Sequence, residues 1–271
     1  DLLKINVSHT LEYLKKEHTN DYLIDFKRID VEKSILDFFD YTLSFSELEK
    51  TILEKKYKLP SHKIINSTPG FNRKYFFHEN IIDARKRINF KNDSKKLLLF
   101  VGRNDYLKGL DIAINTFKKV EKVITSINLG IVGGDIGSDS QKKIQKELIG
   151  NKYSNKIIWF GSVSQDKLRN YYNSSNLVII PSRSETFGMV CLEALASKTP
   201  VIVSNTGRMK DFIEENKTGI VTNNIQPEAF AKNIINFFNG ETKIDFDKKY
   251  YKKIESFEWE KVFKNLYKFF D

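Results

Sequence analysis

The feature that most constrains the fold is a repeated alternation of short apolar segments with longer segments that have helical spacing. The apolar segments are three to five residues long and rich in β-branched residues. They cover residues 5–7, 41–44, 63–65, 97–101, 128–132, 157–160, 177–180 and 201–203. Strands that alternate with helices are typical of βαβ units, in which helices cover a parallel sheet. The sequence therefore predicts an α/β protein.

The two most hydrophobic of these segments, L-L-L-F-V at 97–101 and L-V-I-I at 177–180, show no polar alternation. A strand with one face in water alternates polar and apolar residues, whereas a parallel strand covered on both faces is continuously apolar. We therefore expect both segments to lie in the interior of a parallel sheet.

Composition excludes several other classes of protein. The 271 residues are 40% hydrophobic and 30% charged, with a mean hydropathy of −0.43, which is typical of a globular chain. No stretch has the roughly 18 consecutive apolar residues of a membrane span, and Asp1 to Lys4 lack a signal-peptide pattern. The single cysteine, Cys191, excludes an internal disulfide and a cysteine-rich metal cluster. We expect a cytoplasmic protein without a metal centre.

The net charge of +10 is compatible with nucleic acid, anionic lipid or a phosphorylated small molecule as partner. Of the 45 basic residues, 37 are Lys and eight are Arg, and bidentate readout of phosphates or bases favours Arg. The chain also lacks an aromatic-basic motif and a helix-turn-helix pattern. A nucleic-acid binder is therefore a weak hypothesis for function, and no nucleic-acid partner is expected.

Turn residues at 67–72 and a charged stretch at 83–96 indicate a domain boundary near residue 80. Residues 81–252 contain enough strands for a complete doubly wound domain, whereas residues 1–80 contain only three candidate strands. The first part is thus expected to be the rear half of a domain, and a missing N-terminal segment is expected to complete it. Residues 256–270 have an apolar stripe and predict a terminal helix, within a C-terminal part that we take as 253–271.

Polar residues follow the strand predicted at 177–180. Residues 181–188 lie at its carboxyl end, where open α/β sheets bind ligands, and Gly188 opens a helix whose first amides suit a phosphate or a sugar hydroxyl. Glu185 and Glu193 are eight positions apart and could hold hydroxyls of two rings of one extended ligand. The alternative is a carboxylate that stabilises the helix start, together with a solvated Glu193.

Two further strand ends carry candidate site residues. Arg103 and Lys108 follow the 97–101 strand in one loop and suit a diphosphate, although a surface loop with two ordinary cations is the alternative. Gly133 follows the 128–132 strand, where a ligand or a tight turn would need close approach of the backbone.

Together these stretches resemble the retaining glycosyltransferases of family 4, which have the GT-B fold of two Rossmann-like domains. The resemblance rests on E-T-F-G-M-V-C-L-E at 185–193, on A-L-A-S-K-T-P-V-I-V at 194–203, and on V-G-R-N-D-Y-L-K-G at 101–109. It implies that Arg103 and Lys108 bind the donor diphosphate and that Glu193 binds the ribose. It also implies donor contacts at Gly133 and Val190. The transferred sugar would be held by Glu185 and by the amides around Phe187, Gly188 and Met189.

The first 80 residues resemble the sucrose-phosphate-synthase and mycothiol glycosyltransferase branch of that family, through S-H-T-L at 8–11 and the R-x3-E of Arg28 and Glu32. The resemblance implies that His9 faces the transferred sugar and that Arg28 helps to hold an acceptor phosphate. The alternative for Arg28 is a surface pair with Glu32, four residues along one helix face. By the same resemblance, 1–80 is the acceptor-side domain, 81–252 the donor domain, and the terminal helix crosses back to the first domain.

Three departures from the family pattern stand out. The glycine-rich loop of the first domain is absent from this sequence, and part of the acceptor site is expected to be absent with it. Thr206-Gly207-Arg208 stands where the family has Gly-Gly, which places a cation near the sugar or the acceptor. Lys198 replaces a frequent glycine.

The resemblance implies transfer of a sugar from a UDP-, GDP- or ADP-sugar to a hydroxyl acceptor, with retention and without metal or cofactor. The acceptor is expected to be a sugar, a sugar phosphate or a lipid-linked molecule in polysaccharide or glycoconjugate synthesis. Lysines could bring the protein to the inner face of a membrane. The alternative is a non-catalytic nucleotide-sugar-binding subunit, or a truncated donor domain that needs a partner.

Overall fold

The computed structural model describes residues 2–7, 11–18, 23–91 and 95–270. The chain forms two compact units, one made of Asp1–Gly70 and Trp259–Asp271 and the other of Phe71–Glu258. These are the first and the second unit. The predicted domains at 1–80, 81–252 and 253–271 stay predictions.

The first unit contains a three-stranded parallel sheet in the order β1-β2-β3. Its elements are β1 (Ile5–Val7), α1 (Glu12–His18), α2 (Phe26–Phe38), β2 (Tyr41–Ser44), α3 (Glu47–Lys55), β3 (Ile64–Asn66) and α12 (Trp259–Tyr267). Side chains from α1, α2 and α3 form its core, including the buried Leu14, Leu36 and Leu53. The three predicted strands are therefore confirmed, the third with a shift of one residue.

The predicted terminal helix was too long at both ends. Helix α12 covers only Trp259–Tyr267, rather than 256–270. Residues 257 and 258 pair with Phe71 instead of joining the helix. The Phe71 N–H donates to the Phe257 carbonyl, and Glu258 forms a bridge with Phe71. At its end the chain turns, and Phe269 and Phe270 pack edge to face against Tyr41 of β2.

The second unit contains a six-stranded parallel sheet in the order β6-β5-β4-β7-β8-β9. The strands are β4 (Lys96–Val101), β5 (Ile127–Val132), β6 (Ile157–Gly161), β7 (Leu177–Ile180), β8 (Val201–Ser204) and β9 (Gly219–Thr222). The helices are α4 (Ile81–Arg87), α5 (Leu110–Glu121), α6 (Asp139–Ile144), α7 (Gln165–Ser174), α8 (Met189–Ala196), α9 (Met209–Phe212), α10 (Pro227–Phe238) and α11 (Lys248–Glu255). The α/β class with parallel sheets is confirmed.

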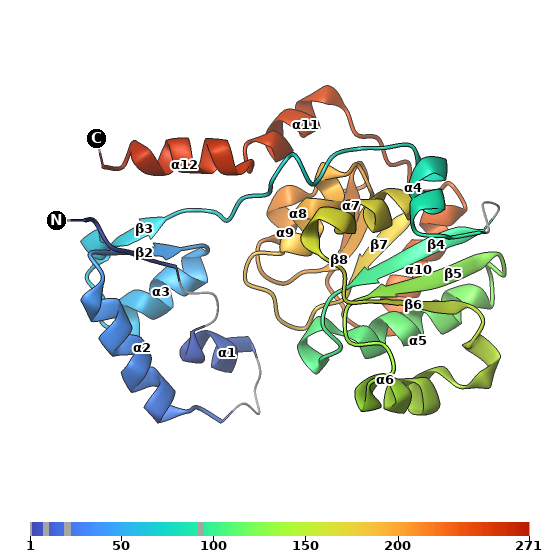
Figure 1. Ribbon diagram of the computed structural model, residues 1–271, viewed down its shortest axis with the longest axis horizontal. Helices are drawn as coiled ribbons and strands as arrows, with labels where there is room; N and C mark the ends of the chain where they lie inside the picture. The colour runs from blue at the N-terminus through green and yellow to red at the C-terminus, as the bar shows by residue number, and fades with distance from the viewer. Residues whose placement is uncertain (1, 8–10, 19–22, 92–94, 271) are drawn as a thin grey trace. The chain divides into compact units, whose positions relative to one another are not determined.

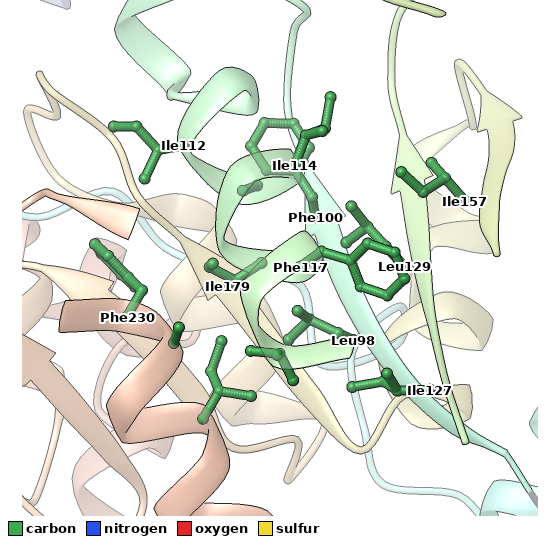
Figure 2. Close-up of a cluster of buried hydrophobic side chains, with 14 of the residues drawn as sticks. Leu98, Phe100, Ile112, Ile114, Phe117, Ile127, Leu129, Ile157, Ile179 and Phe230 are labelled. Carbon is green, nitrogen blue, oxygen red and sulfur yellow. The ribbon is translucent and has the colours of Figure 1, made fainter. Parts of the chain in front are cut away.

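Helices cover both faces of this sheet. Helix α5 packs against α10 on one face, and α4 packs against α7 on the other (Figure 1). Between the sheet and the α5–α10 pair lies a cluster of buried apolar side chains (Figure 2). Leu98 and Phe100 enter it from β4, Phe117 from α5 and Phe230 from α10, and each of these side chains is at most 1% exposed. The central strand β4 is thus fixed by packing as well as by pairing.

Strand β9 is absent from the predicted set. Ile220, Val221 and Thr222 are β-branched and favour a strand, but the run is only four residues long and begins with a glycine, so its local signal is weak. It becomes a strand because it pairs in parallel with β8, with Val201 opposite Gly219 and Ser204 opposite Thr222. A partner strand that is distant in sequence therefore determines this element.

Within the described residues, no helix combines the length and the apolar character that crossing a bilayer requires.

Removal of the Phe117 ring should destabilise the second unit strongly. The side chain is fully buried and packs edge to face on Tyr153 at a centroid distance of 6.2 Å. Phe117→Ala should lower the free energy of unfolding by about 3–5 kcal/mol through lost burial and a residual cavity. Val123→Ala, at a residue that is 61% exposed, is the control and should change it by less than about 0.5 kcal/mol. Urea denaturation followed by circular dichroism measures both, and equal losses would contradict the packing shown in Figure 2.

Candidate functional site

The site lies where the order of strands reverses in the second unit. The chain runs from β4 to β5 and β6 on one side, and then returns to place β7 on the other side of β4. The loops that follow β4 and β7 therefore start from neighbouring positions at the carboxyl edge, which is the usual ligand position in such sheets. The Arg183 N–H donates to the Leu107 carbonyl at 2.8 Å and joins the two loops directly.

Loops after β5 and β8 approach the same place, and glycines permit this approach. Gly133 follows β5, and a Cβ added there would lie 1.9 Å from the Gly102 carbonyl oxygen after β4. Gly207 follows β8, and a Cβ there would lie 2.5 Å from the Glu185 carbonyl oxygen after β7. Both glycines also have positive φ, at +121° and +56°. Close contact with the Gly102 backbone thus explains why residue 133 is a glycine.

Lys108 and Glu185 form the charged pair at the meeting point of the first two loops. The Lys108 Nζ lies 2.7 Å from the Glu185 Oε2, and the two side chains are 25% and 15% exposed. Ser182 places its hydroxyl 3.4 Å from the same oxygen. Two predicted site residues from distant parts of the chain are therefore in direct contact.

Arg103 occupies a different environment from Lys108, although the same loop carries both. Its guanidinium is 78% exposed and lies 3.0 Å from the Asp105 carboxylate. The Asp105 Oδ1 also accepts the Lys108 N–H at 2.9 Å, which shapes the 3-10 turn at Tyr106–Lys108. The Arg103 guanidinium thus lies mostly in solvent, whereas Lys108 is largely covered by protein.

Helix α8 begins directly after Gly188, as the sequence predicts, with Met189 and Val190 half-buried in its first turn. The first N–H groups of a helix lack acceptors within the helix and carry partial positive charge. Phe187 contributes backbone there, because its side chain is 4% exposed and packs on Phe212 at 4.9 Å between ring centroids. This helix start lies next to Glu185.

Glu193 is buried within α8, only 6% exposed. The hydroxyl of Tyr172 from α7 donates to the Glu193 Oε2 at 2.8 Å. Burial raises the pKa of Glu193 to about 7, against the opposing effect of the Tyr172 hydrogen bond. The alternative of a solvated Glu193 is therefore wrong, because α7 packs against α8 and its Tyr172 covers this carboxylate.

The departures from the family pattern also have defined places. Arg208 lies in the loop after β8, directly before α9, where its Nε is 3.0 Å from Asp211 and its guanidinium lies over the Phe187 ring at 5.5 Å. Lys198 comes directly after Ser197, the C-cap of α8, and has a φ of 55°, the left-handed conformation that favours glycine at this position.

The predicted acceptor residues belong to the first unit. His9 lies outside the described residues. The Arg28 Nε lies 2.8 Å from Glu32 and 3.4 Å from the fully buried Glu12, and the Arg28 side chain is 39% exposed. The pair with Glu32 that was the alternative for Arg28 is therefore present, and Glu12 adds a second carboxylate.

Sequence reasoning missed Tyr172 and the pair of Arg183 with Asp111, which are 72 residues apart. Arg183 lies in the quoted stretch after β7, but no spacing signal connects it to Asp111 of α5. Among the described residues, the structure shows no group of three or more His, Cys, Asp or Glu side chains that could hold a metal ion.

Residues 81–257 match the sequence model of the family described as glycosyl transferases group 1. The chain therefore belongs to this glycosyltransferase family.

Individual relatives agree with this assignment. The chain is 26% identical over 235 residues to a D-inositol 3-phosphate glycosyltransferase of Acidothermus cellulolyticus, with 84% of this chain and 52% of the relative covered. It is 33% identical over 154 residues to an uncharacterized glycosyltransferase of Methanocaldococcus jannaschii, with coverages of 54% and 38%. The chain thus spans about half or less of the length of these relatives.

Solved structures show the same fold. Sucrose-phosphate synthase of Thermosynechococcus elongatus superposes with a TM-score of 0.79 at 24% identity, over 98% of this chain and 66% of the other. HepE of Anabaena, solved in complex with UDP-glucose, superposes with a TM-score of 0.78 at 16% identity, over 98% and 71%. The expected GT-B type of fold is confirmed.

The buried Glu193 should make stability depend on pH. Its pKa is about 7 when folded and 4.5 as the ordinary value, so the folded protein binds the proton more tightly. The protonated Glu193 carboxyl therefore stabilises the folded protein at low pH. This stabilisation is lost as the pH rises from about 4.5 through about 7, by up to about 3 kcal/mol. Glu193→Gln should therefore gain stability relative to wild type at pH 8 and gain much less at pH 5. Unfolding in urea at both pH values tests this, with the exposed Glu241→Gln as control. A gain that does not change with pH would contradict it.

Proposed function

We propose that this protein binds a nucleotide sugar and transfers the sugar to a hydroxyl acceptor with retention of anomeric configuration. The observation that carries the proposal is the meeting of Lys108, Glu185 and the start of α8 at the strand-order reversal. A cation and a helix start suit the two phosphates, and a carboxylate beside them suits sugar hydroxyls. One ligand class, the nucleoside diphosphate sugar, has these groups next to each other.

Each residue would then have a distinct role. Lys108, with Arg103 from the solvent side and the first amides of α8, would stabilise the charge that develops on the leaving diphosphate. Glu185 would exchange its contact with Lys108 for hydroxyls of the transferred sugar. Glu193 would accept from the ribose, with Tyr172 keeping its carboxylate in place. In this proposal protein groups neutralise the diphosphate, so neither a metal nor a cofactor is required.

Retention would follow from attack on the face that the diphosphate leaves. The bond from the anomeric carbon to phosphate oxygen breaks, and a bond from the same carbon to the acceptor oxygen forms. The acceptor proton moves to the leaving phosphate oxygen. This step draws on the family resemblance, and it suits a site that offers electrostatic groups rather than two carboxylates about the scissile bond.

The acceptor is proposed to be a sugar, a sugar phosphate or a lipid-linked molecule, and the reaction is proposed to occur in the cytoplasm or at the inner face of a membrane. Two relatives have names that include a sugar or inositol phosphate. His9 and Arg28 would face this acceptor. Because Arg28 already contacts Glu12 and Glu32, a phosphate would have to compete with these carboxylates.

The central experiment incubates the protein with UDP-, GDP- and ADP-sugars that carry a labelled sugar, with sugars and sugar phosphates as acceptors. Transfer supports the enzyme, and the anomeric coupling constant of the product shows retention or inversion. Binding without release or transfer would instead support a non-catalytic nucleotide-sugar-binding subunit.

Lys108→Ala should slow transfer by about 10- to 100-fold, because it removes one charge-assisted contact worth about 1.5–3 kcal/mol. The fold should persist, since the side chain is partly exposed. Lys142→Ala, at a lysine on α6 that is 69% exposed and also pairs with an acid, is the matched control. Equal rates for the two variants would exclude the proposed role of Lys108.

Glu193 and Glu185 should be separable by ligand. Glu193→Ala should weaken binding of both the nucleoside diphosphate and the nucleotide sugar by about tenfold or more, because both contain the ribose. Glu185→Ala should weaken only the nucleotide sugar. Calorimetric titration with both ligands measures this, after circular dichroism has verified folding. The same pattern for both variants would contradict the assignment.

A further inference from the structure

The loop that carries Arg103 and Lys108 is held by a side chain to which the proposed function assigns no role. Arg183, two residues before Glu185, extends from the β7 side to the loop after β4. Its Nη1 and Nη2 lie 2.8 and 2.7 Å from the two carboxylate oxygens of Asp111. The Nη1 also donates to the Tyr106 carbonyl at 2.7 Å.

The aromatic ring of Tyr106 completes this arrangement. The Arg183 guanidinium lies over the ring at 3.9 Å from its centroid, and the guanidinium side chain is only 17% exposed. A bidentate pair with stacking depends on the planar fork of arginine and cannot be copied by lysine. The charge and hydrogen bonds of Arg183 outweigh the effect of burial and lower the pKa of Asp111, so the carboxylate stays ionised at neutral pH.

The contacts fix the backbone that carries Lys108. Tyr106, Leu107 and Lys108 form one 3-10 turn. Arg183 binds the first carbonyl of this turn through its side chain and the second through its own N–H. Asp111 fixes the other end of the arrangement, because it lies in the first turn of α5 directly after the loop. The turn is thus fixed relative to the strand end that carries Glu185.

We propose that Arg183 is a positioning residue that places Lys108 opposite Glu185, acting through Asp111 and the backbone of the 106–108 turn. The proposal rests on the proposed function, in which Lys108 meets the diphosphate. Both terminal nitrogens of Arg183 donate to protein groups, so its effect on the ligand is indirect.

The first test compares Arg183→Met and Asp111→Asn with the control Arg87→Met. Arg87 also pairs with an acid of the second unit, Glu79, but lies in α4. Hydrogen exchange without ligand should show faster exchange of amides 103–108 in the first two variants and unchanged exchange in the control. Unaltered exchange in all three variants would overturn the proposal, whether or not the protein binds a nucleotide.

The second test measures affinity for UDP, GDP and ADP by calorimetry. Arg183→Met and Asp111→Asn should each weaken the best of these ligands about tenfold, and the double variant should be no weaker than either single variant. Lys108→Ala should lose most of its effect when combined with Arg183→Met, because a misplaced lysine contributes little. Additive effects of these substitutions on affinity would instead indicate independent structural roles and would contradict the proposal.

The outcomes separate the inference from the proposed function. If Asp111→Asn binds like wild type while Arg183→Met does not, Arg183 contacts the ligand directly and the positioning role is wrong. If both bind like Arg87→Met, the role is also wrong. If wild type binds none of the diphosphates but exchange changes as expected, the proposed function fails, whereas the restraint of the loop by Arg183 is retained.

Discussion

The parallel pairing of β4 with both β5 and β7 is the constraint on which the candidate site depends. It places the ends of three strands side by side, so that loops distant in sequence start from one edge. Packing of Leu98 and Phe100 against α5 and α10 holds β4 in this position. Only small residues then fit where the loops touch, and Gly133 against Gly102 is the tightest case. The site is therefore a product of the sheet and its core.

Electrostatics in the site follow a common pattern, in which each cation already has an acidic partner. Lys108 pairs with Glu185, Arg103 with Asp105, Arg183 with Asp111 and Arg208 with Asp211. Partly exposed pairs add little to stability, typically 0–1 kcal/mol. Their importance is geometric, because each pair holds its side chains in a defined position. Replacing one partner by a ligand group would then lose little free energy of interaction. The difference between Arg103 and Arg183 is one of exposure, 78% against 17%, and it separates a group that can reach a ligand from one that restrains a loop.

In the first unit, the buried Glu12 changes how the R-x3-E motif of Arg28 and Glu32 is interpreted. The R-x3-E of Arg28 and Glu32 could be read as an acceptor site or as a helix-surface pair. The structure shows the pair and adds Glu12, which is fully buried and lies 3.4 Å from Arg28. Two carboxylates reduce the positive charge that Arg28 could offer to a phosphate. Its role toward an acceptor stays a prediction that depends on this competition.

The sequence by itself determined the α/β class, the eight strands predicted from apolar segments, the start of α8 after Gly188, and the family motifs around Arg103, Lys108 and Glu185. These features depend on local periodicity and on residues that follow a strand directly, so short stretches are sufficient to encode them. Only the tertiary structure decided that 219–222 pairs as a strand, that Glu193 is covered by Tyr172, and that Arg183 binds Asp111. Each of these requires residues distant in the chain to meet in a defined geometry. No local pattern specifies such a meeting, because burial and pairing are set by the packing of the whole sheet with its helices.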